Sequence, residues 1–124
     1  MANEIKVSLS ITAEKNGAKF ARQEVFNDDM AGDAWTTGVQ QVSTNEQITD
    51  HGDITTYGWI YLKNLGTNSA NYVTFGRESI ADATDHICRL YGGESCVIKT
   101  AGLTALWAVS STGTQAVEYA IIEL

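Results

Sequence analysis

The sequence predicts an all-β fold: an antiparallel, jelly-roll-like β-sandwich of about eight strands with little helix, formed by residues 1–124 as a single domain. Three observations predict it. Short segments rich in Val, Ile, Tyr, Phe and Thr recur at regular spacing along the chain. Several of them alternate between apolar and polar residues, and turns containing Gly separate them. Evenly spaced short strands of this kind are typical of sandwiches and barrels.

The first strand shows the clearest alternation. Ile5, Val7, Leu9 and Ile11 are separated by polar residues, so one face of this strand is apolar. Asn16-Gly17 follows, and this dipeptide is a strong signal for a two-residue hairpin turn.

The return segment, residues 18–27, is less regular. Pairing about the Asn16-Gly17 turn places Arg22 and Glu24 on the face that carries Ile11 and Leu9. A bulge that shifts the register, a face turned toward solvent, or a partly helical segment would each accommodate these charges. We expect a strand here.

The middle of the chain holds three further strand candidates. Residues 39–42 form a short one, and a short extended piece is expected at Ile48. Residues 57–65 and 71–76 are rich in residues that favour strands. In the 57–65 segment, Ile60 and Leu62 lie on one face and the aromatic residues on the other.

The last third predicts a second hairpin and two more strands. Residues 86–91 and 95–99 flank Gly92-Gly93 as hairpin arms, and Ala101-Gly102 is expected to turn the chain. The strand at 103–110 is expected to place Trp107 in the core. The final strand, residues 115–124, is apolar on both faces, which is typical of a central strand or of one covered by another subunit.

Composition excludes several classes of partner. The net charge is −7 and the isoelectric point is about 4.6. The eight Lys and Arg are scattered, which argues against direct nucleic-acid binding. No apolar run has the length of a membrane span, and the N-terminal residues lack a signal core, so we expect a product made in the cytoplasm. There Cys88 and Cys96 are expected to be reduced, partly buried thiols.

We expect no catalytic site, cofactor or metal. The motifs of a nucleophile elbow and of phosphate loops are absent from the sequence. His86 lies two residues from Cys88, but no third group completes a thiol dyad. Asp28, Asp29 and Asp33 are interpreted as a solvated acidic loop rather than a calcium site.

Large apolar residues outside the expected core are the candidates for a protein interface. Trp35, Trp59 and Tyr61 are the proposed anchors. A second layer or loop could instead cover Trp59 and Tyr61, or these rings could stack on sugars. The terminal strands add the remaining candidates, with one of them able to pair across subunits: Ile5, Val7, Tyr119, Ile122 and Leu124.

Several short motifs, in order along the chain, resemble those of small structural proteins of tailed bacteriophages. These are Asn16-Gly17 after the first alternating strand, GWIYLKNL at 58–65, NYVTFG at 71–76, LYGGE at 90–94 and VEYAIIE at 117–123. Many members of that group have Pro at the position of Gly92. The motifs span most of the chain, and none of them is a chemical signature.

The resemblance implies a β-sandwich component of a virion. Within that group, a capsid decoration (cement) protein is the expected function. Such a protein binds the major capsid protein lattice at the virion surface, commonly as a homo-oligomer and most often a trimer. A tail or head–tail component and a carbohydrate-binding β-sandwich module are the alternatives.

Overall fold

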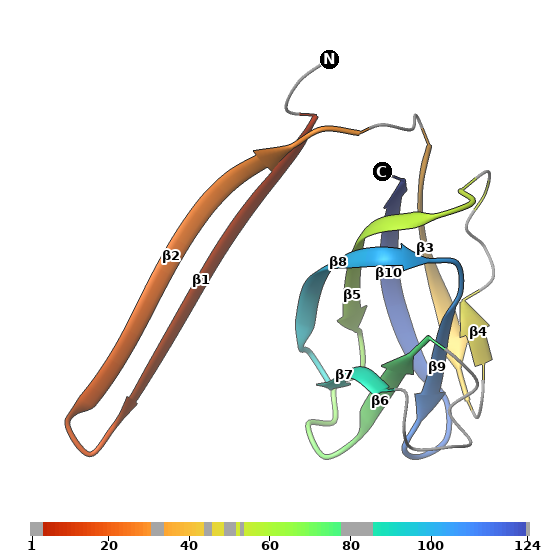
Figure 1. The fold of residues 1–124 in the computed structure, drawn as a ribbon. Helices are drawn as coiled ribbons and strands as arrows, with labels where there is room; N and C mark the ends of the chain where they lie inside the picture. Colours follow the sequence, from red (N-terminus) through yellow and green to blue (C-terminus); the bar gives the residue numbers. More distant parts are fainter. Residues whose placement is uncertain are drawn as a thin grey trace. The chain divides into compact units, whose positions relative to one another are not determined.

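The computed structural model describes residues 4–30, 34–43, 46–48, 52, 54–77 and 86–123, and within these residues the protein is all-β. The chain divides into two compact units, Met1–Ala31 and Gly32–Leu124. Ten strands are present in the described residues, against about eight expected (Figure 1). They are β1 (Ile5–Lys15), β2 (Ala18–Asp28), β3 (Trp35–Val42), β4 (Glu46–Ile48), β5 (Tyr57–Asn64), β6 (Tyr72–Gly76), β7 (His86–Tyr91), β8 (Ser95–Leu103), β9 (Leu106–Ser110) and β10 (Gln115–Glu123).

The first unit is the β1–β2 hairpin. Its two strands pair antiparallel from Ile5↔Asp28 to Lys15↔Ala18 without a register shift. Asn16 and Gly17 have φ angles of 53° and 83°, the positive values that a type I′ turn requires. The predicted turn and the predicted return strand are both confirmed, and no bulge interrupts them.

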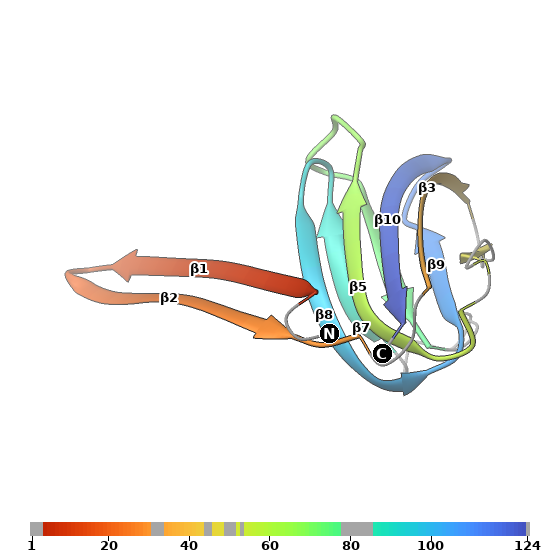
Figure 2. The ribbon, with the colours of Figure 1, turned by 90° about the horizontal axis from the view of Figure 1, so that it is seen from above.

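The second unit is an antiparallel β-sandwich, which confirms the predicted fold class. One sheet has the strand order β3-β10-β5-β8, and the other has the order β4-β9-β6-β7. Figure 2 shows the two curved sheets facing each other. The strands that form the sandwich all follow the hairpin in sequence, whereas the expected single sandwich domain began at residue 1.

The strands of the sandwich pair in a nested pattern. The outermost pair in sequence is β3 with β10, and inside it lie β4 with β9, β5 with β8 and β6 with β7. Two further ladders, β10 with β5 and β9 with β6, join these pairs into the two sheets. The sandwich is therefore a folded-back ribbon of paired strands that has been wound into two layers.

The core lies between the two sheets. Apolar residues from both layers are fully or almost fully buried there: Val42, Ile54, Tyr57, Ile60, Leu62, Val73, Phe75, Leu90, Leu106, Ala108, Val117, Tyr119 and Ile121. Ile60 and Leu62 point inward, as their alternation predicts. β10 is an internal strand of its sheet, as its two apolar faces predict.

A buried polar cluster connects the two sheets. The Asn64 side chain on β5 donates to the Leu90 carbonyl on β7 at 3.1 Å and to Gln115 Oε1 on β10 at 3.0 Å. Its own oxygen accepts from the Gly66 N–H at 2.8 Å. Gln115 in turn donates to the Tyr72 carbonyl at 2.9 Å and to Ser110 Oγ at 2.6 Å. Both donors and the acceptor of the Asn64 amide are therefore used, and the links between the two sheets are the Asn64–Leu90 bond and the bonds of Gln115 to Tyr72 and Ser110.

Three predictions about the last third of the chain are wrong. β7 and β8 are not the arms of one hairpin, because β7 pairs with β6 in one sheet and β8 pairs with β5 in the other. Strand β8 also runs through the expected turn at Ala101-Gly102 to Leu103.

The position of Trp107 is the third correction. On β9 the buried positions are Leu106, Ala108 and Ser110, whereas Trp107 is half-buried on the opposite face. The sequence predicted one strand over residues 103–110, but β8 ends at Leu103 and β9 begins at Leu106, so the alternation does not continue from Leu103 to Trp107.

Candidate protein interface

The β1–β2 hairpin has one apolar face. Residues that face each other across an antiparallel pair point to the same side of the ribbon. One side therefore carries the apolar residues Ile5, Val7, Leu9, Ile11, Ala13, Ala18, Phe20 and Phe26. The opposite side is mostly polar and includes Lys6, Ser8, Ser10, Thr12, Glu14, Lys19, Gln23 and Asn27, with Ala21 and Val25. The hairpin is thus an amphipathic ribbon.

The apolar face of this hairpin is exposed along much of its length. Ile11 is 56% exposed and Phe20 is 47% exposed, and Leu9 and Phe26 have similar values. A two-stranded ribbon has no second layer of its own to bury such side chains, and isolated hairpins are only marginally stable in water. Full burial of a large apolar side chain gains roughly 1.5–3 kcal/mol, and because these side chains are about half exposed, covering each with a partner would gain about half of that.

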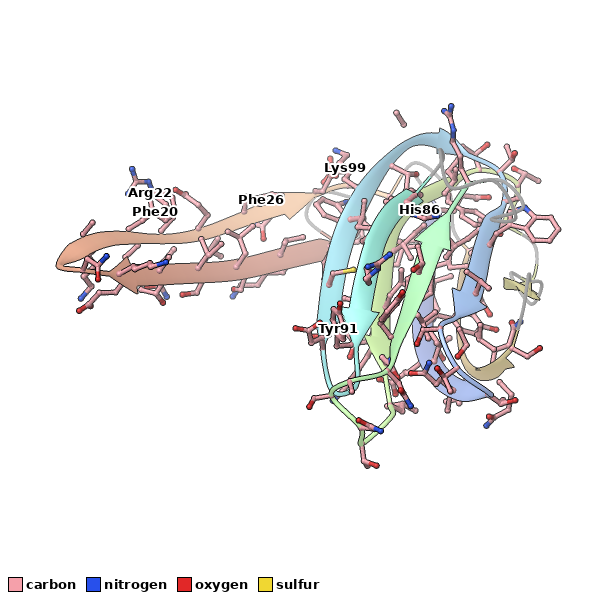
Figure 3. The ribbon with its side chains drawn as sticks, turned by 90° about the horizontal axis from the view of Figure 1, so that it is seen from below. Phe20, Arg22, Phe26, His86, Tyr91 and Lys99 are labelled. Carbon is pink, nitrogen blue, oxygen red and sulfur yellow. The ribbon has the colours of Figure 1, made fainter. Side chains whose placement is uncertain are left out.

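Two charged residues lie within the apolar face. Arg22 pairs across the ladder with Ile11, and Glu24 pairs with Leu9. The Arg22 guanidinium lies over the Phe20 ring, 4.7 Å from its centre, and donates to the Ala21 carbonyl at 2.8 Å (Figure 3). Lys15 and Asp28 lie at the two ends of the same face, so it carries charges of both signs, which give a partner polar contacts that fix its orientation.

The outer face of the β3-β10-β5-β8 sheet is the second apolar surface. The strand registers place Trp35, Ile122, Trp59 and Lys99 in one row across the four strands, and Thr37, Ala120, Tyr61 and Val97 in the next. A third row holds Val39, Glu118, Lys63 and Ser95. Trp35 is 69% exposed, and Val39 and Val97 are also well exposed. We call this surface the front face.

A shallow depression of about 510 Å³ lies on the front face, lined by residues of β3, β5 and β10 that include Thr37, Val39, Tyr61 and Glu118. The Tyr61 hydroxyl donates to Glu118 Oε1 at 3.3 Å. Partial desolvation and the adjacent Glu118 carboxylate raise the pKa of Tyr61 above its ordinary value, so its hydroxyl stays a neutral donor. The depression thus has an aromatic wall beside a carboxylate.

The structure brings four of the predicted interface residues onto the front face: Trp35, Trp59, Tyr61 and Ile122. Their exposure differs. Trp35 is open and Tyr61 is partly exposed, whereas Trp59 is only 7% exposed, with the Lys99 ammonium 5.7 Å from the centre of its ring. Trp59 therefore does not present a free aromatic surface.

The other predicted interface residues lie elsewhere. Ile5 and Val7 are at the start of β1 and are buried. Tyr119 points into the sandwich core and is also buried. Leu124 lies outside the described residues.

Sequence reasoning missed Val39 and Val97 on the front face, and Leu9, Ile11, Phe20 and Phe26 on the hairpin. The front-face residues lie on edge strands whose alternation is weak, so the sequence offers little signal for them. The hairpin residues could have been identified from the sequence. The register set by the Asn16-Gly17 turn predicts that charged and apolar residues share one face, as they do in the structure.

The groups considered for chemistry are separated or paired in other ways. His86 is exposed on β7, and the thiol of Cys88 contacts Cys96. Among the residues that the structure describes, no three or more His, Cys, Asp or Glu side chains gather where they could hold a metal ion. Asp33 lies outside these residues. No helix in the described part of the chain has the length and apolarity of a membrane span.

No protein family model, curated protein or solved structure matches this chain.

Proposed function

We propose that this chain is a structural protein without catalytic activity: a capsid decoration protein of a tailed bacteriophage. In this proposal it is made in the host cytoplasm as a homo-oligomer, with a trimer favoured, and binds the major capsid protein lattice at the virion surface. Its role is to stabilise the assembled shell.

The exposed apolar face of the β1–β2 hairpin carries the proposal. Leu9, Ile11, Phe20 and Phe26 lie on one side of an extended ribbon, and each is more than two-fifths exposed. Exposed apolar surface of this kind marks interaction sites. A ribbon of 11 residues in each strand can lie along a neighbouring protein and bury this face against it.

The nested strand pairing adds support of a different kind. We infer that the sandwich is a jelly roll, because winding an antiparallel ribbon of paired strands into two four-stranded sheets produces the observed strand orders. Jelly rolls are used in viral capsid and lectin domains, among others. The resemblance of the sequence motifs to tailed-phage structural proteins favours the first of these uses.

Shell stabilisation would follow from mass action. A protein that binds the assembled lattice and not its separated subunits stabilises the lattice by its binding free energy. Several copies on one shell multiply the effect, and a homo-oligomer that engages more than one capsid subunit gains avidity.

The test is co-sedimentation of the full chain with expanded, empty capsids of tailed phages. We expect the wild-type protein to pellet with the shells of its own phage. Ile11→Glu places a charge in the centre of the apolar face and should weaken binding by about 30-fold, corresponding to about 2 kcal/mol.

Thr12→Glu is the matched control, because it adds the same charge one residue away on the polar face of the same strand. It should bind as the wild type does. Equal weakening by both variants, or no binding of the wild-type chain to any shell, would contradict the proposal. Binding to isolated tails and not to shells would instead support the tail or head–tail alternative.

A carbohydrate-binding module is the second candidate, and the depression beside Tyr61 favours it. An aromatic ring next to a carboxylate can stack on a sugar and accept hydrogen bonds from its hydroxyls. Trp59 is too little exposed to be the stacking platform. Binding to a glycan array that Tyr61→Ala abolishes would establish this function, and an array without signal would remove it.

A further inference from the structure

Cys88 and Cys96 are brought together from different sheets. Cys88 lies within β7, at one edge of the β4-β9-β6-β7 sheet, and Cys96 lies near the start of β8, at one edge of the β3-β10-β5-β8 sheet. The turn at Gly92-Gly93 carries the chain from the first sheet to the second. A bond between these residues would therefore join the two layers rather than the arms of a hairpin.

The two thiols are close enough to react. The two Sγ atoms are 3.7 Å apart, and both residues are free cysteines. Both side chains are half-buried and pack against the core, since Cys88 is paired with Phe75 and Cys96 with Leu62 on inward-facing positions. A disulfide needs a sulfur–sulfur separation about 1.6 Å shorter, which small side-chain rotations can provide.

We propose that Cys88 and Cys96 form a reversible disulfide that links the two sheets of the sandwich when the chain meets a low-molecular-weight disulfide such as oxidised glutathione. The Cys96 thiolate attacks one sulfur of the small disulfide and releases one small thiol. The Cys88 thiolate then attacks Sγ of Cys96 in the mixed disulfide and releases the second. The protein loses two electrons, the small disulfide gains two, and the two protons from the cysteines end on the released thiols.

The hydrogen bond between the two thiols favours this order of events. It lowers the pKa of Cys96, against the opposing effect of burial, because the Cys88 thiol stabilises a Cys96 thiolate. The same hydrogen bond, together with burial, raises the pKa of Cys88 well above its ordinary value. The thiolate is the reactive form of a cysteine, so Cys96 attacks first and Cys88 completes the bond.

This inference is independent of the proposed function, because it concerns only groups within the sandwich. Both thiols remain reduced in a cytoplasm and become oxidised in an environment without a reducing glutathione pool. The disulfide would then hold β7 and β8 together at edges that share no ladder in the described structure.

The experiment uses the full chain, purified in reductant, desalted without oxygen and incubated with oxidised glutathione. We expect the intact mass to fall by two hydrogen atoms, both thiols to become unreactive toward iodoacetamide, and the protein to remain in its original oligomeric state. The oxidised protein should melt higher than the reduced protein by several degrees, on the order of 5–10 °C.

Two variants test the order of attack. Cys88→Ser retains the first nucleophile and should accumulate a glutathione adduct on Cys96. In Cys96→Ser the hydrogen bond between the thiols is gone, but burial still raises the pKa of Cys88, so this variant should be modified more slowly. Neither variant should melt higher after oxidation. Two iodoacetamide-reactive thiols after oxidation, bonds formed only between chains, or an oxidised wild-type protein that melts no higher than the reduced one would each overturn the proposal, and none of these measurements depends on a variant folding.

Discussion

At the scale of single residues, Asn64 has the most demanding position in the sandwich. It is fully buried, and both donors and its acceptor are used within the cluster that joins the sheets. A buried polar group that loses its partner costs roughly 1–3 kcal/mol. The sequence could not identify this role, because Asn64 ends a strand next to Leu65 and Gly66, where Asn is also common in turns.

We therefore expect Asn64→Asp to destabilise the protein by about 3 kcal/mol or more at neutral pH, because the carboxylate cannot donate to the Leu90 carbonyl or to Gln115. Burial raises the pKa of a carboxyl group, so the folded variant would bind its proton more tightly than the unfolded one, and the loss of stability should grow as pH rises. Urea unfolding at two pH values measures both effects.

Asn68→Asp is the control for this change. Asn68 is exposed, and its oxygen accepts from the Ala70 N–H at 2.9 Å, which an Asp side chain can also do. The free energy of unfolding of the Asn68→Asp variant should stay within about 0.5 kcal/mol of the wild-type value. A similar, small effect at both positions would show that the Asn64 cluster contributes little to stability.

Gly92 marks a close approach of backbone segments. A Cβ atom at this position would lie 2.6 Å from the Asn68 carbonyl oxygen and 2.9 Å from that of Gly66. The Gly92 N–H also donates to the Asn71 carbonyl at 3.2 Å. A proline here would lose that donor and require residues 66–71 to move.

Gly92→Ala should consequently cost about 1–3 kcal/mol, because backbone atoms must shift to admit the methyl group. Gly93→Asn provides the comparison. Gly93 has a φ of 87° with open space around it, and Asn is the residue that best tolerates positive φ after Gly. Thermal unfolding should separate the two variants, and equal melting temperatures would rule out the steric argument.

At the scale of elements, local pattern predicted strands better than it predicted their partners. The alternation from Ile5 to Ile11 and the Asn16-Gly17 turn identified the first hairpin, because both signals lie within a few residues. The Gly92-Gly93 segment gave a similar signal but connects two sheets. The strands on either side of it do not pair with each other: β7 pairs with the preceding strand β6, and β8 pairs with the more distant β5, and such choices depend on the whole winding of the chain.

The same reasoning explains the partial prediction of the interface. Strand β10 lies between β3 and β5, and its register places Ile122 between Trp35 on β3 and Trp59 on β5. The sequence alone identifies the apolar residues but does not predict the strand pairing that places them in one row across the sheet. It also does not predict how exposed each side chain is, and exposure is what distinguishes the open Trp35 from the buried Trp59.

The β1–β2 hairpin should be the least protected paired element in the free protein. Residues 9–24 are exposed, and in the described part of the chain each strand of the hairpin is hydrogen-bonded to one neighbouring strand only. By contrast, β5 and β10 are internal strands with neighbours on both sides and the core behind them. We expect amide hydrogens of residues 9–24 to exchange at least 100-fold faster than those of β5 and β10. Hydrogen exchange followed by mass spectrometry measures this, and equal protection would show that the hairpin is not an independently opening element.

At the scale of the whole molecule, the net charge opposes association between copies through the apolar surfaces. The chain carries −7 at neutral pH while it exposes the hairpin face and part of the front face. Repulsion between equally charged copies limits association through these surfaces. Near the isoelectric point of about 4.6 this repulsion disappears, so apolar contacts between copies should then dominate.

Light scattering should therefore show additional, reversible association of the wild-type protein as the pH falls from 7 toward 4.6. Ile11→Glu should reduce it strongly and Thr12→Glu only slightly. Both variants add the same ionisable group at neighbouring positions, so any effect of charge alone is equal in the two. Ile11 lies on the apolar face and Thr12 on the polar face, so the difference between them reports the burial of the hairpin face itself. If both variants suppress association equally, charge alone controls it, and the hairpin face is not the surface through which copies meet.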